Sequence, residues 1–399
     1  MALYTLSGTE AFTGEDLRQG VKLALEVVNE PLDLPLPMAR GKGLSRHGGM
    51  PLKVVFADCQ GDPARAAELV EEHAARGAVA FMGCYSSALT EVASRRAESL
   101  GIPFLNAAST APLLTRRGFR WFFRTTPDDA MFSAMQFDFL DGVSPQGRDS
   151  VPGGVALVYE NGLWGTGVSR EQMRQARRRG YAIAADEPYA IDGLAPEAVA
   201  ARVRDARPSV VLQASYAADA VALVRAMGDT GGRCLGIMGM NAGFIDPRFL
   251  SELGPVAEHV LSREVFALDL APGRPALSAA NALFRSRYDR DMTGNSARTL
   301  TGLLVLADAL DRAESFEPED VRRALLATNI PAAQVPLPWN GVRFHPENGQ
   351  NVLGGGIVVQ VQDGAWVTVW PPAAAAANPV WPRRSRPVGG RHGGVDGRP

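Results

Sequence analysis

Short apolar runs alternate with segments of three-to-four periodicity along the first hundred residues of the chain. The runs predict strands at 2–6, 52–57, 78–82 and 103–105, and the periodic segments predict amphipathic helices between them. One helix covers 14–28, and the next begins at Pro63 behind the N-cap residue Asp62. Strands that alternate with helices predict a parallel sheet with helices on both faces and right-handed crossovers.

The same alternation starts again after Pro127 and predicts a second sheet. Its strands are expected at 154–159, 181–185, 210–214 and 235–238, and its helices at 129–140, 165–179, 195–206 and 217–227. A strand at 259–267, helices at 276–291, 297–313 and 318–327, and short β segments at 342–344, 357–362 and 366–370 follow. Residues 373–399 lack periodicity and predict a disordered tail.

Two loops combine hydroxyl side chains with the expected start of a helix. They are Gly83-Cys84-Tyr85-Ser86-Ser87 and Asn106-Ala107-Ala108-Ser109-Thr110, and each follows an apolar strand. Amide groups in the first turn of a helix lack intrahelical partners and lie at the positive end of the helix dipole, so they form a site for a carboxylate. Neither loop places a base beside a nucleophile, which favours binding over catalysis.

Composition and charge narrow the class of protein. A length of 399 residues exceeds one ordinary core and predicts two domains. Hydrophobic residues make up 46% and charged residues 21% of the chain, and no apolar run is long enough to span a membrane. A net charge of −2 with dispersed basic residues indicates no nucleic-acid-binding face. The five histidines are scattered, so neither a metal nor a cofactor is expected.

Short motifs occur in a fixed order from residue 1 to about 370. They are Leu6-Ser7-Gly8 with Gly14, Gly20 to Ala24 with Asn29, Asp58 with Asp62-Pro63, Gly83 with Ser87, Gly101-Ile102-Pro103, Ala108 to Pro112 with Leu114-Thr115 and Gly118, Phe123-Arg124-Thr125, and Phe344 with Gly349-Gln350-Asn351. Together they resemble the type I periplasmic binding proteins, in the branch typified by the leucine-isoleucine-valine-binding protein of bacterial transport systems.

The resemblance implies an α/β fold of two lobes, each a doubly wound parallel sheet flanked by helices, with three chain crossings as a hinge. The first lobe is expected over 1–125 plus 254–336, and the second over 126–253 plus 337–372. The implied function is the solute receptor of an ABC transporter, which captures a small carboxylate or amino acid and delivers it to a membrane permease. The resemblance implies a periplasmic or other extracytoplasmic location, although residues 1–6 already predict a strand and no signal peptide is visible.

The resemblance also assigns roles to residues of the expected cleft. Ser87 donates its hydroxyl to the ligand carboxylate, Thr110 binds the same group through its hydroxyl and N–H, and the Ala108 carbonyl accepts from an α-ammonium. Ser109 belongs to the same loop. The alternative for Ser87 is a helix N-cap. Trp164 and Tyr216 lie at positions where relatives place aromatic residues over the ligand, their alternative being core packing. Thr13, beside Phe12, lies in a loop that often contributes to the pocket.

Asn241 departs from the pattern of the resembling family. Relatives that bind an amino acid commonly have a carboxylate at this position, after the strand that ends near Met238. A buried ammonium needs charge compensation, which the amide of asparagine does not supply. The expected ligand is therefore an acid without an α-amino group, unless Glu160 or Asp246 takes the role.

Two other classes of protein compete with a transport receptor. A cytoplasmic sensor of small amides that regulates gene expression shares the fold, and Gly83-Cys84-Tyr85 resembles the sequence of such regulators at that point. The Ala108-Ser109-Thr110 loop has no counterpart in those regulators. An enzyme is disfavoured because the chain has no dinucleotide fingerprint, phosphate loop or nucleophile elbow. Some of the resembling proteins bridge the loops that hold Cys59 and Cys84 here, which implies that these thiols approach disulfide distance in an exported protein.

Overall fold

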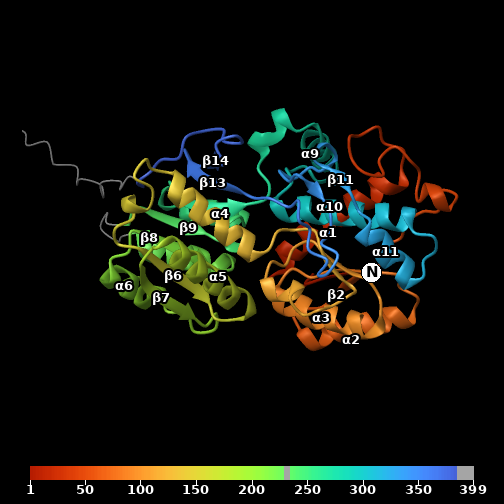
Figure 1. Cartoon of the computed structure of the whole chain (residues 1–399), viewed down its shortest axis with the longest axis horizontal. Helices are drawn as coiled ribbons and strands as arrows, with labels where there is room; N and C mark the ends of the chain where they lie inside the picture. The colour runs from red at the N-terminus through yellow and green to blue at the C-terminus, as the bar shows by residue number, and fades with distance from the viewer. Residues whose placement is uncertain (229–233, 384–399) are drawn as a thin grey trace, which may run out of the picture.

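The computed structural model describes residues 1–228 and 234–383 as two lobes that lie side by side (Figure 1). In this part of the chain the first lobe contains a parallel sheet of order β2-β1-β3-β4-β5. Its strands are β1 (Ala2–Tyr4), β2 (Phe56–Asp58), β3 (Phe81–Gly83), β4 (Phe104–Asn106) and β5 (Phe122–Arg124). Its helices are α1 (Ala11–Asn29), α2 (Pro63–Ala75), α3 (Ser87–Leu100), α9 (Pro275–Tyr288), α10 (Gly294–Arg312) and α11 (Pro318–Leu326).

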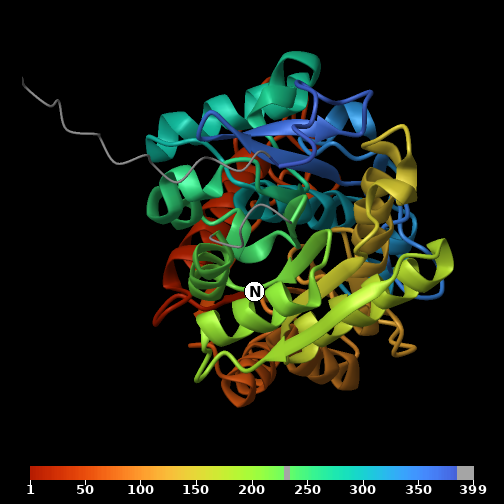
Figure 2. The same cartoon turned by 90° about the vertical axis from the view of Figure 1, so that its left-hand side faces the viewer.

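The second lobe contains a sheet of order β14-β13-β10-β9-β8-β6-β7. Its strands are β6 (Val155–Glu160), β7 (Ile183–Tyr189), β8 (Val210–Ala214), β9 (Gly236–Gly239), β10 (Leu261–Glu264), β13 (Ile357–Gln362) and β14 (Ala365–Trp370). The helices of this lobe are α4 (Asp129–Gly142), α5 (Leu163–Arg179), α6 (Pro196–Ala206), α7 (Ala217–Gly228) and α8 (Pro247–Leu253). Figure 2 looks onto this lobe, with the yellow-green strands and the blue C-terminal strands at opposite ends. β11 (Ile330–Pro331) and β12 (Gly341–Val342) form a separate small ladder.

The alternation of strands and helices is confirmed, with one difference in the second sheet. β13 pairs antiparallel with both β10 and β14, so this sheet is mixed at one end and parallel elsewhere. A short hairpin joins β13 to β14, and strands joined by a tight turn can only pair antiparallel. The N-terminus of α2 forms as predicted, because the Asp62 carboxylate accepts from the N–H groups of Ala64 and Arg65 at 2.7 and 3.2 Å.

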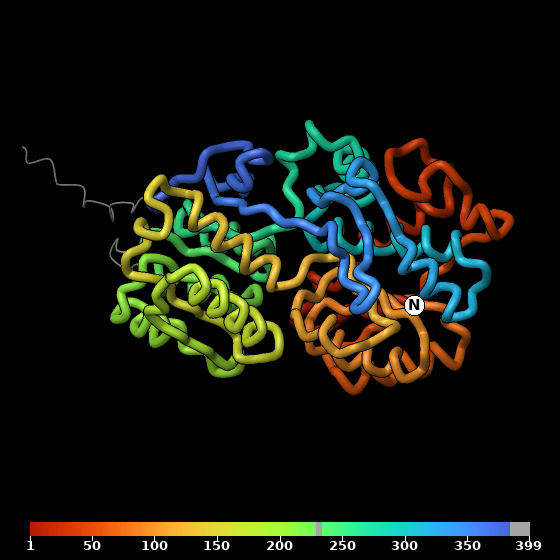
Figure 3. The backbone as a smooth tube through the Cα atoms, viewed as in Figure 1, coloured from red at the N-terminus to blue at the C-terminus, as the bar shows by residue number. Residues whose placement is uncertain are grey.

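The expected division of the chain needs three corrections. The segment 337–372 begins against the first lobe, because the Phe344 and Phe123 ring centroids are 5.2 Å apart and the Arg124 N–H donates to the Gly349 carbonyl at 2.8 Å. β10 pairs with β9 and β13, so the segment 254–336 begins in the second lobe, and the chain crosses after β10. Yellow, teal and blue segments of the tube pass between the lobes in Figure 3. The expected tail 373–399 is ordered as far as the structure describes it: Trp381 packs 6.0 Å from Phe139, and the Arg383 side chain donates to the Glu258 and Val256 carbonyls. Residues 384–399 lie outside the described residues.

Apolar packing covers both faces of each sheet. One buried cluster lies beneath α2 and α3 of the first lobe, and a second lies beneath α6, α7 and α8 of the second lobe. The largest cluster continues from one lobe into the other, from Val28 in α1 to Leu212 in β8. The carboxyl ends of β3, β4, β8 and β9 lie where the two lobes join. This is the edge at which parallel α/β sheets bind ligands.

Candidate functional site

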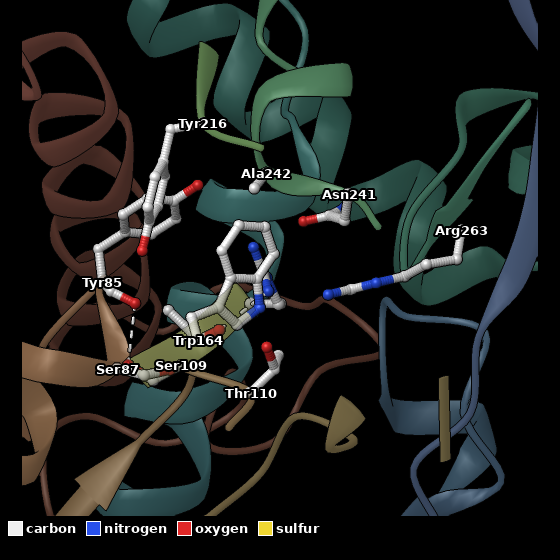
Figure 4. A pocket seen from close by; sticks show the side chains of 11 residues that line it. Tyr85, Ser87, Ser109, Thr110, Trp164, Tyr216, Asn241, Ala242 and Arg263 are labelled. Atoms are coloured by element: carbon white, nitrogen blue, oxygen red, sulfur yellow. Dashed lines mark hydrogen bonds between the residues drawn. The ribbon is translucent and has the colours of Figure 1, made fainter. Parts of the chain in front are cut away.

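A narrow pocket with an empty volume of about 290 Å³ lies between the two lobes. We call it the inner pocket (Figure 4). It is lined by Tyr85, Ser87, Ala108, Ser109, Thr110, Trp164, Tyr216, Asn241, Ala242, Arg263 and Arg298. Seven of the eight expected site residues are in this list. The structure thus brings both hydroxyl loops of the first lobe together with the expected aromatic residues of the second.

Ser87 opens α3 but is not its cap. The N-cap is Ser86, whose Oγ accepts from the Leu89 N–H at 3.3 Å. The alternative interpretation of Ser87 as an N-cap is therefore wrong. Ser87 is 2% exposed, and its Oγ accepts from the Ala111 N–H at 3.3 Å. Its hydroxyl hydrogen is left to donate into the inner pocket.

The second loop is fixed by a buried polar network. The Asn106 side chain donates to the Gly83 carbonyl at 2.7 Å and accepts from the Ser109 N–H at 2.9 Å. Ser109 Oγ lies 2.9 Å from the Tyr85 carbonyl and 3.1 Å from that of Cys84. Ser109 thus ties the two loops to each other, in addition to lining the pocket. A network with its members satisfied holds both loops rigidly.

Ala108 and Thr110 have neighbours that the sequence did not indicate. The Ala108 carbonyl accepts from Nη1 of the buried Arg298 at 3.1 Å, at the position expected to receive an α-ammonium. The Thr110 carbonyl accepts from the Asp129 N–H at 2.9 Å. Burial raises the pKa of the Asp129 carboxyl to about 6, against the opposing effect of Arg263.

Three aromatic rings form one wall of the inner pocket. The Trp164 and Tyr216 ring centroids are 5.0 Å apart, and those of Tyr85 and Tyr216 are 6.5 Å apart. Tyr85 follows β3 of the first lobe, whereas Trp164 and Tyr216 belong to the second, so the rings meet across the lobes. Burial raises the pKa of the Tyr85 and Tyr216 hydroxyls, which stay neutral and act as hydrogen-bond donors at physiological pH.

Asn241 presents an uncharged acceptor to the pocket. Its Nδ2 donates to the buried Glu264, which leaves Oδ1 facing the pocket (Figure 4). The two carboxylates proposed as substitutes are engaged elsewhere. Glu160 accepts from the N–H groups of Gly162 and Gly165, both at 2.5 Å, at the start of α5. Asp246 caps α8 and forms an ion pair with Arg248 at 2.7 Å.

Arg263 and Arg298 are the pocket residues that the sequence analysis missed, together with Tyr85 and Ala242. Arg263 lies on β10 and Arg298 on α10, and they are 2% and 1% exposed. Burial lowers the pKa of Arg263 to about 10, so the guanidinium is charged at neutral pH. An arginine and a glutamate inside the apolar segment 259–267 were the available signal, because such residues are rarely buried without a partner.

Thr13 lies outside the inner pocket. It lines a larger groove of about 1630 Å³ that opens from the pocket and shares Tyr85, Trp164 and Tyr216 with it. We call this the outer groove. Thr13 also borders a smaller side pocket with Phe12, whose side chain is 50% exposed. Phe12 and Thr13 lie in the first turn of α1 and not in a loop as expected, so the start of this helix faces the entrance of the cleft.

Cys59 and Cys84 are buried free thiols, and the influence of Cys84 lowers the pKa of Cys59 to about 6, so the two thiols are neighbours. Formation of the disulfide stays a prediction. Across residues 1–228 and 234–383, no cluster of three or more histidine, cysteine or acidic side chains is arranged to hold a metal ion. Within the same ranges, no helix combines the length and the apolar character that a membrane crossing requires.

Comparisons with known proteins agree with this geometry. A family model described as "Periplasmic binding protein" matches residues 2–365. The Leu/Ile/Val-binding protein homolog 8 of Brucella abortus is 28% identical over 391 residues, covering 94% of this chain and 91% of that protein.

Two solved structures illustrate the likeness in fold. A leucine-binding protein from Thermotoga maritima superposes with a TM-score of 0.76 at 18% identity, covering 92% of this chain and 96% of that one. A solute-binding protein of an ABC transporter from R. palustris, in complex with benzoate, superposes with a TM-score of 0.74 at 16% identity. The match covers 94% of this chain and 96% of that one. The family match over most of the chain and the two-lobed fold show that this protein belongs to the periplasmic binding protein family, with the type I fold.

Proposed function

We propose that this protein is the substrate-binding component of an ABC transporter and that it captures a small carboxylate without an α-ammonium group. One observation carries the choice of ligand: the described lining of the inner pocket contains two arginines and no acidic side chain. An anion is stabilised there, whereas a buried ammonium would lack the opposite charge that it needs.

The contacts around the pocket support the same ligand class. Arg298 donates a hydrogen bond to the Ala108 carbonyl, and the amide nitrogen of Asn241 donates one to Glu264. Ser87 and Thr110 remain as hydroxyl donors to a carboxylate at the first-lobe loops. The benzoate bound by the R. palustris protein is an acid of this class, and the Thermotoga protein is named for an amino acid, so the fold accommodates either.

Capture proceeds by closure of the two lobes. A ligand held by Thr110 of the first lobe and by Arg263 of the second touches both only in the closed state, and therefore shifts the equilibrium towards it. The proposed partner is a membrane permease that recognises the closed form outside the cytoplasm. A cytoplasmic amide sensor is the weaker candidate, because a neutral amide would bring no charge to the two arginines.

A matched pair of ligands tests the proposal. Leucine and its 2-oxo analogue are titrated into the protein by calorimetry, beside a thermal-shift screen of aromatic acids, amino acids and amides. We expect the amino-free acids to bind at least tenfold more tightly, which is about 1.4 kcal/mol. Tighter binding of leucine by the same ratio would show that the ammonium is recognised. A shift with amides alone would favour the sensor.

A further inference from the structure

Arg263 approaches the inner pocket with an unused hydrogen-bond donor. Its guanidinium lies 3.6 Å from the centroid of the Phe132 ring, and Nε is 3.3 Å from Met240 Sδ. Nη1 is buried and has no hydrogen-bond partner among the described residues. Figure 4 shows the guanidinium pointing across the pocket towards Trp164. Buried donors are rarely left unsatisfied, because an unpaired buried polar group costs about 1–3 kcal/mol.

Arg298 adds a second cation with donors to spare. Its Nε and Nη1 donate to the carbonyls of Gly294 and Ala108, both at 3.1 Å, and Nη2 donates to Asn295 Oδ1. These bonds use three of the five N–H groups of a guanidinium. Two therefore remain on a side chain that lines the pocket.

The acidic neighbours of these arginines only partly compensate them. Asp129 Oδ1 is 3.7 Å from Arg263 Nη2, beyond hydrogen-bond distance, and burial raises the pKa of its carboxyl to about 6. Glu264 accepts from Asn241 through one oxygen and from the Val265 N–H at 2.7 Å through the other, so both oxygens already have a donor. Neither acid lines the inner pocket, and the groups that do line it favour an anion.

The two places for an anion are separate. In Figure 4, Ser87 and Arg263 lie on opposite sides of the Trp164 indole, one reached from the first-lobe loops and the other from β10. Resting on the proposed function, we infer that the ligand is a small dicarboxylate: the Ser87–Thr110 loops, with Arg298 beside Ala108, bind one carboxylate, and Arg263 binds the other. The inner pocket is narrow, with an empty volume of only about 290 Å³, and this limits the acid to a short chain.

Chain-matched acids test this inference on the whole protein. Succinate against butyrate, glutarate against pentanoate, and adipate against hexanoate are titrated by calorimetry at one pH and ionic strength. We expect at least one diacid to bind tenfold or more tightly than its monoacid. Equal affinity within every pair overturns the dicarboxylate inference and leaves carboxylate capture intact. If neither member of any pair binds, and the ligands of the earlier screen do not bind either, the proposed function fails as well.

Variants of Arg263 assign the second carboxylate to its site. Arg263→Gln is expected to reduce the diacid-to-monoacid affinity ratio to about one, because it removes the charge that the second carboxylate requires. Arg263→Lys keeps the positive charge, so we expect it to retain part of the preference for the diacid over the monoacid. This variant replaces Arg263→Gln in the test if Arg263→Gln does not fold. Arg202→Gln, an exposed arginine of the same lobe paired with Glu187, is the matched control. A ratio in Arg263→Gln equal to that of the unmodified protein overturns the assignment.

Discussion

Asn241 adopts a backbone conformation that few residues other than glycine adopt, with φ 62° and ψ −134°. Its N–H donates to Ser262 Oγ at 3.2 Å, and its side chain donates to Glu264. Backbone strain of this kind persists where the surroundings hold it and is common at ligand sites. Here it turns an uncharged acceptor towards the ligand and keeps a carboxylate behind it.

Thr110→Val tests the hydroxyl expected to bind the ligand carboxylate. The change preserves shape and removes a hydrogen bond to a charged group, so we expect affinity to fall by about 1.5–3 kcal/mol, or roughly ten- to a hundredfold. Calorimetry with the acid identified in the screen measures it. Thr301→Val is the control, because that buried hydroxyl bonds only to the Ala297 carbonyl in α10. Unchanged affinity in Thr110→Val would remove the residue from the site.

Asp219 links stability to pH in the outer groove. Burial raises the pKa of its carboxyl from 3.8 to about 6, although the Tyr189 hydroxyl at 3.4 Å lowers it. Between these values the folded protein keeps a proton that the unfolded chain releases, so the free energy of unfolding falls as pH rises from about 4 to 6.

Asp219→Asn removes this contribution. We expect the variant to match the unmodified protein at pH 4 and to exceed it by up to about 2 kcal/mol at pH 7, measured by denaturation without ligand. Asp192→Asn changes an exposed carboxyl of the same lobe and serves as the control. A variant whose stability follows the unmodified protein at both pH values would contradict the prediction.

Helices α1 and α10 approach each other closely because glycine stands at the contact. A Cβ on Gly20 would lie 2.2 Å from the Ser296 carbonyl oxygen and 2.3 Å from Thr299 Oγ1. α10 begins with a capping box formed by Thr293 and Ser296, and it carries Arg298 on its second turn. The contact between the two helices therefore sets the position of a pocket residue.

Gly20→Ala is expected to destabilise the protein by about 1–3 kcal/mol, because the added methyl forces the helices apart. Gly167→Ala is the matched control in α5, where the nearest atom is Pro112 Cδ at 3.7 Å. The control is expected to gain roughly 0.5–1 kcal/mol from helix propensity alone. Thermal melts compare the two. A Gly20→Ala variant as stable as Gly167→Ala would show that α1 and α10 accommodate the added methyl with no loss of stability.

An ion pair connects the two lobes as whole bodies. Arg116, before β5 of the first lobe, donates to Glu171 of α5 at 2.9 Å. Tyr85 and Tyr216 meet across the same boundary, so the lobes are in contact around the site. Interactions that exist only in the closed state bias the equilibrium towards it and raise the apparent affinity for ligand.

Arg116→Ala is expected to weaken ligand binding about two- to fivefold, although Arg116 does not line the inner pocket. The effect is small because a partly exposed ion pair contributes less than about 1 kcal/mol. Arg174→Ala is the control, because Arg174 pairs with the same carboxylate inside α5 and keeps its partner in either state. Calorimetry gives the affinity, and X-ray scattering in solution gives the radius of gyration. Equal effects of both variants would exclude a role for the pair in closure.

The sequence by itself determined the order of strands and helices, the two sheets and the loops that are proposed to bind an anion. These features depend on local periodicity and on caps such as Asp62, which act within a few residues. The motifs around Ser87 and Thr110 also pointed to the correct sheet edge, because parallel strands present their carboxyl ends together. Asn241 was identified as a departure for a reason of charge that the sequence alone provides.

Only the tertiary structure decided which charges surround the ligand. Arg263, Arg298 and Tyr85 come from β10, α10 and the loop after β3, and no local pattern relates segments so far apart. The assignment of β10 to the second sheet likewise depended on pairing with β13, about a hundred residues later. Long-range pairing and the burial of charge are set by the whole fold, so the two arginines that support the proposed anion site came together only when these elements met.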